Sequence, residues 1–431
     1  MTTSAAREGG HSVAPASGGD RLPPGLVPPT YGVDSLAAVL PGAAGALGVE
    51  VETATGLRSV ECASALRLPD TRRVVVVLVD GLGLHNLAER GGHAPFLRSL
   101  LGEARRLTST FPSTTAAALS VLGTGTATGL TGMVGYTQRT PGTGGTEGMG
   151  RANGLATMVS WTEQSDPYRP GTKLSAPLRT TPADLQREPT VFETLADAGM
   201  SVVAPGPARF EGSGMTLAAL RGPRYIVAES LSERVDATVR ALRGPGVAYL
   251  YQGDVDKVGH QHGPESWQWG DALEETDGEL RRLVRSLPAG TLVLVTADHG
   301  QIQADLARQW DVAAEPELAR DVALLGGEPR AVHVYTDADA DADPAEVAKR
   351  WSGVLGDAAV VTTRAEAMES GWFGPVADHV LPSIGDVVVA MTGRATVVDS
   401  RLHTPQARAL PGVHGSLTET EMHVPLLVAV A

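Results

Sequence analysis

The chain has 431 residues, and 42% of them are hydrophobic, which is enough for a large buried core and excludes a chain that is disordered throughout. Its 35 Lys and Arg residues are outnumbered by 49 Asp and Glu residues, and the resulting charge of −14 excludes the broad basic surface that holds a nucleic acid polymer. The single cysteine, Cys62, excludes an intrachain disulfide framework and a zinc site made of cysteines.

Residues 1–30 are rich in Gly, Ser and Pro and have almost no apolar periodicity, so we expect a flexible tail there. Residues 31–431 are expected to form the globular part. No apolar run approaches the roughly 18 residues of a membrane span, and the first residues lack the pattern of a signal peptide. We therefore expect a cytoplasmic protein that has no membrane partner.

Three apolar, β-branched runs predict buried strands at 73–79, 246–251 and 291–296. Further strands are expected at 201–204, 331–335, 386–391 and 424–430. A helix is expected over 189–199, where Thr190 precedes an apolar-periodic run and Gly199 ends it. The alternation of strands and helices predicts an α/β protein with a mostly parallel central sheet.

Residues 301–410 are acidic and rich in Ala and Asp, and we expect part of this range to be an inserted cap subdomain. Alternating Asp residues at 337–343 suggest a calcium loop, but an EF-hand needs Gly and Glu where this chain has Ala342 and Ala348. A solvated loop that caps a helix starting near Pro344 is the preferred interpretation.

Each of the three buried strands is followed by acidic residues. The carboxyl ends of parallel strands meet at one edge of a sheet, so these side chains are expected to gather there. The carboxyl and imidazole groups that follow the strands, or lie in a late glycine-flanked turn, are Asp80, Asp256, His260, Asp298, His299 and His414. Such nitrogen and oxygen donors suit zinc, although a simple ion pair in a polar loop is the alternative for Asp256 and His260.

The segment from Phe111 to Leu119 is a turn that leads into a good helix former. A hydroxyl at a helix N-terminus faces free backbone N–H groups, where a phosphoryl oxygen is stabilised. Helix capping by Ser113 or Thr114 is the alternative interpretation. Beside a two-metal site, however, a threonine hydroxyl is a candidate nucleophile.

Five motifs occur in a fixed order: Asp80-Gly81, Pro112 to Thr115, Asp256 to His260, Asp298-His299-Gly300 and His414-Gly415. In this order they resemble the alkaline phosphatase superfamily, and most closely its nucleotide pyrophosphatase/phosphodiesterase branch. The resemblance covers roughly residues 70–300 and 410–431. It implies a three-layer α/β/α fold and a metal-dependent hydrolase of phosphate esters, with a small phosphorylated substrate such as a nucleotide.

The resemblance also implies two zinc ions. One would be held by Asp256, His260 and His414, and the other by Asp80, Asp298 and His299, with Thr115 beside it. Thr115 is the preferred nucleophile because it stands nine residues before Thr124-Gly125, as in the family, while Thr114 and Thr110 are alternatives. The Asp-x-x-x-His spacing selects His260 and leaves His262 out of the ligand set.

The chain departs from the phosphodiesterase branch near Gly132. The branch has an Asn four residues beyond this glycine, where the chain has Tyr136, and a His before it, where the chain has Thr131. Tyr136 and Gln138 are candidates for binding the phosphate, with a structural role as the equal alternative. Trp161 is a candidate for stacking on a base, although a core or surface role is the preferred interpretation.

Because of these departures, a phosphomonoesterase and a phosphonate hydrolase of the same superfamily are alternatives to a phosphodiesterase. A sulfatase is disfavoured, since Cys62 lacks the Cys/Ser-x-Pro-x-Arg context of that chemistry. An inert metal-binding descendant is disfavoured because all six ligands are present.

Overall fold

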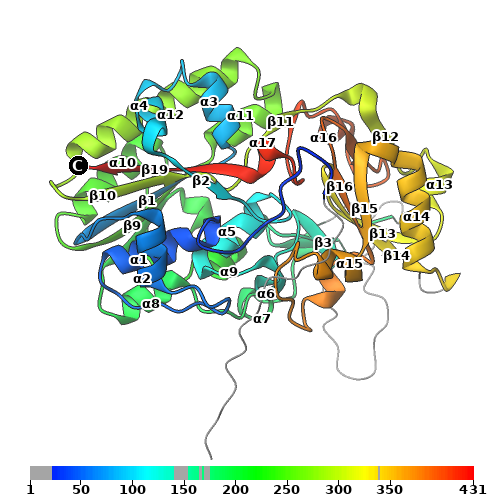
Figure 1. Ribbon diagram of the computed structural model, residues 1–431, viewed down its shortest axis with the longest axis horizontal. Coiled ribbons are helices and arrows are strands. Elements are labelled where there is room, and N and C mark those ends of the chain that lie inside the picture. The colour runs from blue at the N-terminus through cyan, green and yellow to red at the C-terminus, as the bar shows by residue number, and fades with distance from the viewer. Residues whose placement is uncertain (1–21, 140–153, 165–166, 169–174, 338–339) are drawn as a thin grey trace, which may run out of the picture.

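The computed structural model describes residues 22–139, 154–164, 167–168, 175–337 and 340–431. In this part of the chain two large β-sheets lie beside each other, one in each half of the molecule (Figure 1). The valine-rich segment that the sequence marks as a buried strand is β1 (Arg73–Val79), and it lies at the centre of the first sheet.

The first sheet is mostly parallel. Its order is β2 (Arg105–Thr108), β19 (His423–Val430), β10 (Leu292–Thr296), β1, β9 (Gly246–Gln252), β7 (Val202–Gly206) and β8 (Arg224–Val227). Among these described strands only β19 runs against β1. The side chains of β1 from Val74 to Val79 are fully buried, because elements cover both faces of the sheet. The expected α/β class with a mostly parallel central sheet is confirmed.

Helices cover both faces of this sheet (Figure 1). On one face lie α3 (Leu84–Arg90), α4 (Pro95–Leu100), α10 (Leu231–Ala241), α11 (Asp254–His262) and α12 (Trp267–Ser286). On the other lie α1 (Val39–Ala46), α2 (Ser59–Leu66), α5 (Thr115–Thr124), α8 (Val191–Asp197) and α9 (Gly214–Ala219). This is the expected three-layer α/β/α arrangement. None of the helices in the described ranges is both long and apolar enough to cross a membrane.

Two helix starts follow the local signals in the sequence. Helix α8 begins after Thr190, whose side chain accepts a hydrogen bond from Glu193 N while the Glu193 carboxylate accepts one from Thr190 N. Helix α14 (Pro344–Leu355) begins after Asp343, whose carboxylate accepts a hydrogen bond from Ala345 N. Asp343 therefore acts as a helix cap, as expected; residues 338–339 of the same loop lie outside the described residues.

The second sheet is antiparallel and draws on two distant parts of the chain. Its order is β15 (Ala359–Thr363), β16 (Val387–Met391), β14 (Ala331–Thr336), β13 (Val322–Glu328), β3 (Thr137–Arg139), β4 (Leu155–Thr157), β5 (Thr162–Gln164) and β6 (Ala176–Pro177). A single pairing, Gly327 with Thr137, joins the two parts. The sheet thus takes four strands from 322–391, within the expected insertion, and four from 137–177, outside it.

The described chain also contains smaller α-helices and two short strand pairs. They are α6 (Thr128–Thr131), α7 (Pro182–Leu185), α13 (Pro316–Ala319), α15 (Arg364–Glu369), α16 (Pro405–Arg408), α17 (Glu419–Met422), and the strand pairs β11 (Ile302–Gln303) with β18 (Gly412–Val413) and β12 (Gln309–Asp311) with β17 (Thr396–Val398).

The expected tail over 1–30 is corrected at its C-terminal end. Val27 N donates to Leu417 O at 2.7 Å, and Leu26 forms a β-bridge with Thr418. The apolar side chains of Leu22, Leu26 and Val27 pack against a buried cluster around Phe111. Residues 22–30 are therefore attached to the body of the protein, and residues 1–21 lie outside the described part.

Candidate active site

The carboxyl ends of three neighbouring strands carry the acidic motifs. Asp80 directly follows β1, Asp298 and His299 follow β10, and Asp256 lies in α11, which begins just after β9. Since β1 pairs with both β9 and β10 in parallel, the three strands deliver these side chains to one edge of the sheet.

Asp80, Asp298 and His299 form a first cluster of donor atoms. His299 Nε2 lies 3.5 Å from Asp80 Oδ1 and 3.4 Å from Asp298 Oδ2. All three side chains are buried. This separation between donors fits one shared ion, because ligand bonds of about 2.0–2.2 Å place neighbouring ligands somewhat over 3 Å apart.

Asp256, His260 and His414 form a second cluster. Asp256 and His260 stand one turn apart on α11, with His260 Nε2 3.3 Å from Asp256 Oδ2, while His414 Nε2 lies 3.9 Å from Asp256 Oδ1. The rings of His299 and His414 stack with centroids 3.6 Å apart, so the two clusters are immediate neighbours. His262, which the spacing leaves out, is exposed and belongs to neither cluster.

Backbone carbonyls orient all three imidazoles. His260 Nδ1 lies 2.8 Å from Gly412 O, His414 Nδ1 lies 2.9 Å from Ser113 O, and His299 Nδ1 lies 3.2 Å from Gly300 O. A carbonyl only accepts, so each Nδ1 carries a hydrogen and each Nε2 is the nitrogen available to a metal. The Nε2 atoms face the carboxylates, which is the arrangement of metal-binding histidines.

The charges at this edge are poorly balanced within the protein. Burial, followed by the nearby Asp298, raises the pKa of Asp80 well above its ordinary value. Burial opposes ionisation of Asp256, but the attraction of His260 prevails and lowers the pKa of Asp256, while the pKa of His260 rises to about 9. Burial, and then His299, lowers the pKa of His414 well below its ordinary value. Three crowded carboxylates and a neutral imidazole are a donor set that cations stabilise.

One buried oxygen supports the same conclusion. Asp298 Oδ1 accepts hydrogen bonds from Gly81 N at 3.1 Å and His299 N at 3.0 Å, whereas Asp298 Oδ2 has no hydrogen-bond partner. A buried carboxylate oxygen without a partner is costly unless an ion or water satisfies it. The donor set, its orientation and this oxygen fit a bound divalent cation in each cluster.

A glycine after Asp80 allows the two clusters to approach each other. Gly81 has φ of +71°, and a Cβ at this position would lie 2.9 Å from the Asp256 Cβ. A larger residue would thus be strained by its backbone and would push Asp256 of α11 away. The glycine of the Asp-Gly motif is explained by this close approach.

Thr115 is the hydroxyl that lies beside the first cluster. It is the first residue of α5, and its Oγ1 lies 3.3 Å from His299 Nε2 and 3.5 Å from Asp80 Oδ1. Of the alternatives, Thr110 donates its hydroxyl to Pro112 O at 2.6 Å, and Thr114 occupies the N-cap position of α5. Neither Thr110 nor Thr114 has a hydrogen bond to the clusters among the described contacts.

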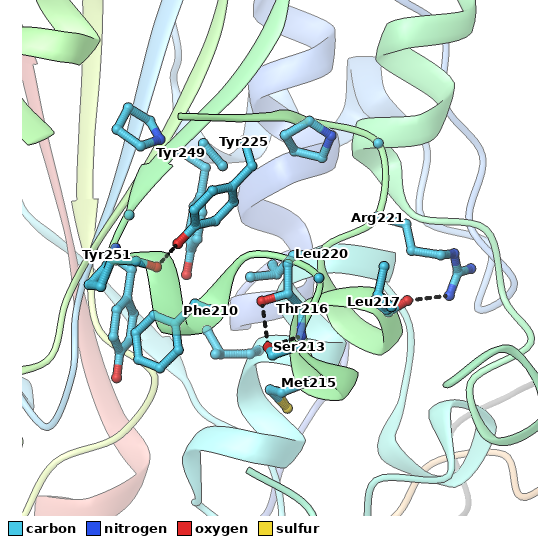
Figure 2. Close-up of a pocket in the computed structure, with 18 of the residues that line it drawn as sticks. Phe210, Ser213, Met215, Thr216, Leu217, Leu220, Arg221, Tyr225, Tyr249 and Tyr251 are labelled. Carbon is cyan, nitrogen blue, oxygen red and sulfur yellow. Dashed lines mark hydrogen bonds between the residues drawn. The ribbon is translucent and has the colours of Figure 1, made fainter. Parts of the chain in front are cut away.

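An apolar cavity of about 420 Å³ opens next to Thr115. Figure 2 shows its aromatic wall, in which Phe210 and Tyr251 lie side by side near Tyr225 and Tyr249. The lining residue with a charged side chain, Arg221, is already paired with Glu193 at 3.0 Å and with several backbone carbonyls. The cavity therefore offers apolar and aromatic contacts to a ligand, but no free cation from its described lining.

Comparison with known proteins decides the family. The model of the type I phosphodiesterase / nucleotide pyrophosphatase family matches residues 74–417. The chain belongs to this family. It is accordingly an enzyme, a hydrolase that acts on phosphoester bonds, and the expected membership of the alkaline phosphatase superfamily is confirmed.

Solved structures show the same fold. Murine ectonucleotide pyrophosphatase / phosphodiesterase 5 is 16% identical with a TM-score of 0.58, and the match covers 83% of this chain and 87% of that protein. Phosphonoacetate hydrolase from Sinorhizobium meliloti 1021, solved with phosphonoformate, is 20% identical with a TM-score of 0.61 and coverages of 88% and 93%. Each of these two proteins is similar to this chain in fold.

A buried carboxyl group that the sequence analysis missed lies beside the clusters. Glu328 is the last residue of β13 in the second sheet, and its side chain packs against Gly415, whose added Cβ would lie 2.6 Å from Glu328 Cγ. The Thr114 hydroxyl faces this carboxyl, yet neither carboxyl oxygen has a well-formed hydrogen bond. Burial raises the pKa of Glu328 to about 8.

Two further residues that the sequence analysis missed hold the metal-binding side chains in place. Gln301 Nε2 donates to Asp256 Oδ1 at 2.8 Å, and the Tyr251 hydroxyl donates to Asp80 Oδ2. Gln301 directly follows the Asp-His-Gly motif, which was an available signal. Tyr251 lies in a strand that the sequence predicts, but nothing in that strand's pattern marks it as functional.

The three expected substrate contacts have different surroundings. Gln138 is fully buried, and its amide donates to Gly132 O and accepts from Val134 N, so its described contacts lie within its own loop. Trp161 donates to Thr180 O and packs against Gly214 of α9, outside the lining of the cavity. These contacts favour the structural interpretation of Gln138 and Trp161, while Tyr136, which is 44% exposed and near Glu328, stays a candidate.

Proposed function

We propose that this enzyme is a phosphodiesterase that uses Thr115 as its nucleophile and two zinc ions, and that its substrate carries an aromatic group such as a nucleoside. The observation that carries the proposal is the position of the Thr115 hydroxyl. It lies 3.3 Å from His299 Nε2, which places it within the first cluster and directly beside the second.

The two clusters and Thr115 have separate roles in the proposed reaction. Asp80, Asp298 and His299 would hold one ion, and Asp256, His260 and His414 the other; when bound, such ions lower the pKa of a hydroxyl or water and neutralise charge on the phosphoryl group. Thr115 Oγ gives up its proton and attacks phosphorus in line with one ester oxygen. That P–O bond breaks, the alcohol leaves with a proton, and the phosphoryl group is transferred to the threonine with its remaining ester substituent. Water then attacks phosphorus opposite Thr115 Oγ and loses a proton, the Oγ–P bond breaks, and the threonine hydroxyl is restored.

The cavity supports an organic group on the phosphate. Its walls are aromatic and aliphatic, and its charged side chain, Arg221, is already neutralised by Glu193. A substrate with a carboxylate, such as the phosphonoacetate bound by the hydrolase of similar fold, would need a cation there. An aryl or nucleoside ester needs apolar surface and ring contacts, which the cavity supplies.

The similar solved structures also support the proposal. The murine phosphodiesterase 5 was solved as an inactive variant, with one threonine changed to alanine, in complex with AMP. A threonine needed for activity and a nucleotide ligand are what we propose for this chain.

The test is a panel of chromogenic substrates with and without chelation. We expect the purified enzyme to hydrolyse p-nitrophenyl thymidine 5′-monophosphate faster than p-nitrophenyl phosphate, and to leave phosphonoacetate intact. Dialysis against a chelator should abolish the activity, and zinc should restore it. Faster turnover of the monoester would indicate a phosphomonoesterase, release of phosphate from phosphonoacetate would indicate a phosphonate hydrolase, and full activity without metal would contradict the mechanism.

A further inference from the structure

A third cluster of metal-ligating side chains lies outside the candidate active site. His85 is near the start of α3, Glu419 opens α17, and His423 is the first residue of β19. One donor atom from each lies within 4.8 Å of the other two. Within the described ranges, the only other groups with this spacing are the two clusters of the active site.

The two imidazoles are already close to a shared-ion geometry. His85 Nε2 lies 3.1 Å from His423 Nδ1, and the rings are stacked with centroids 5.4 Å apart. Two nitrogens on a tetrahedral zinc ion, with bonds of about 2.0–2.1 Å, are separated by about 3.3 Å. A small increase in their separation would therefore let both lone pairs face one ion. The competing interpretation is an N–H···N hydrogen bond between the two rings.

The surroundings suit an ion at the protein surface. His423 is buried, His85 is partly exposed and Glu419 is exposed, so water can reach the ion and fill a fourth position. The Glu419 carboxylate adds an oxygen ligand to the two imidazole nitrogens. Two histidines and a glutamate are a ligand set found at zinc sites.

We propose that His85, Glu419 and His423 bind a zinc ion that fastens α3 to the junction of α17 and β19. The two segments that the ion would join, α3 and the α17–β19 junction, both hold the turn after His299. Asn86, next to His85, donates to Gln301 O at 2.9 Å, and Glu421 O, between Glu419 and His423, accepts from Gly300 N at 2.9 Å. The ion holds these two supports together, and its role is structural.

The test counts zinc in the intact protein. Wild type, His85→Ala and Glu419→Ala are loaded with zinc, separated from free metal by gel filtration, and analysed by mass spectrometry of the metal. We expect each variant to contain one zinc ion fewer per chain than wild type. The matched control is His262→Ala, which removes an exposed histidine outside all three clusters and should keep the wild-type count.

Thermal unfolding provides a second measurement. Zinc that binds only the folded state raises the melting temperature, so the increase caused by zinc should be smaller in His85→Ala than in wild type. Equal zinc counts in wild type, His85→Ala and Glu419→Ala would overturn the proposal and leave a hydrogen-bonded histidine pair. Because the test measures a difference of one ion, its outcome does not depend on the ions or activity proposed for the catalytic clusters.

Discussion

The hydroxyl of Tyr251 donates a hydrogen bond to Asp80 Oδ2, which joins the wall of the apolar cavity to the first metal-binding cluster. Burial raises the pKa of Asp80, and this hydrogen bond opposes the rise. It also fixes the carboxylate so that Oδ1 is the oxygen that lies 3.5 Å from His299 Nε2. Tyr251 is therefore a positioning residue that keeps Asp80 oriented for a metal and favours its ionised form.

Tyr251→Phe should weaken zinc binding in the first cluster and lower kcat by about 10- to 100-fold, the usual effect of removing a partner of a metal ligand. KM should change little, since the ring that lines the cavity remains. The control is Tyr225→Phe, because the Tyr225 hydroxyl donates to Pro207 O at 2.8 Å and touches neither cluster. Steady-state kinetics would contradict this role if both variants had the same kcat.

His414→Ala should remove one zinc ion and most of the activity. The His414 ring supplies Nε2 to the second cluster and stacks on His299 in the first, so no other side chain can take its place. Zinc content and turnover measured beside His262→Ala provide the comparison, since that exposed histidine belongs to neither cluster. An unchanged zinc count in His414→Ala would remove His414 from the ligand set.

Glu328→Gln should alter the pH dependence of stability in the chelated protein. The pKa of Glu328 rises from 4.5 to about 8 on folding, so the folded state binds this proton more tightly than the unfolded state. Its contribution to the free energy of unfolding is therefore present below about pH 4.5 and is lost as the pH rises towards 8. The free energy of unfolding in urea should fall less between pH 5 and pH 9 in Glu328→Gln than in wild type. Identical losses would contradict a buried Glu328 carboxyl with a raised pKa.

The sequence is sufficient to predict the first sheet and the metal-binding clusters for a physical reason. The residues of β1 are a nearly continuous valine run, which is typical of a strand that is buried on both faces of a sheet. The motif that follows each strand lies at the carboxyl end of that strand. Parallel pairing of β9, β1 and β10 then brings Asp80, Asp256 and Asp298 together. Local pattern and one rule of topology are enough for this part.

The second sheet and its contribution to the site depend on long-range contacts that leave no local signal. The strands β3 to β6 contain only two or three residues each, too few to show a period, and one pairing links Thr137 to Gly327. Glu328 reaches the site because it packs on Gly415, which belongs to a distant part of the chain. Likewise, His85 and His423 are neighbours in space although 338 residues separate them.

Phe210→Ala should raise KM for an aryl or nucleoside diester by about 10-fold, because a partly buried aromatic contact contributes about 1 kcal/mol or more to binding. Phe210 lies edge-on to Tyr251, with ring centroids 6.1 Å apart, and both line the cavity. The hydrolysis of p-nitrophenyl phosphate, which releases the same p-nitrophenolate but carries no nucleoside, should be less affected. Trp267→Ala is the control, as Trp267 is exposed on α12 and does not line the cavity. Equal KM values in the two variants would exclude this cavity as the site of the organic group.

Thr115→Ala should abolish turnover while zinc content and melting temperature stay near those of wild type. The threonine hydroxyl lies among the donor atoms of the first cluster, and alanine is at least as good a helix former at the start of α5. Loss of a nucleophile lowers turnover by several orders of magnitude. Zinc-loaded enzyme assayed with a chromogenic diester measures this directly.

The matched controls are Thr114→Ala and Thr110→Ala. Removal of the Thr110 hydroxyl loses its hydrogen bond to Pro112 O, which costs about 1 kcal/mol of stability but leaves the reacting groups in place. Thr114 is the N-cap of α5 and faces Glu328, so its loss should also act on stability rather than on turnover. If Thr115→Ala keeps wild-type turnover and one control does not, the nucleophile is that neighbour; if all three variants stay active, covalent catalysis by this turn is wrong.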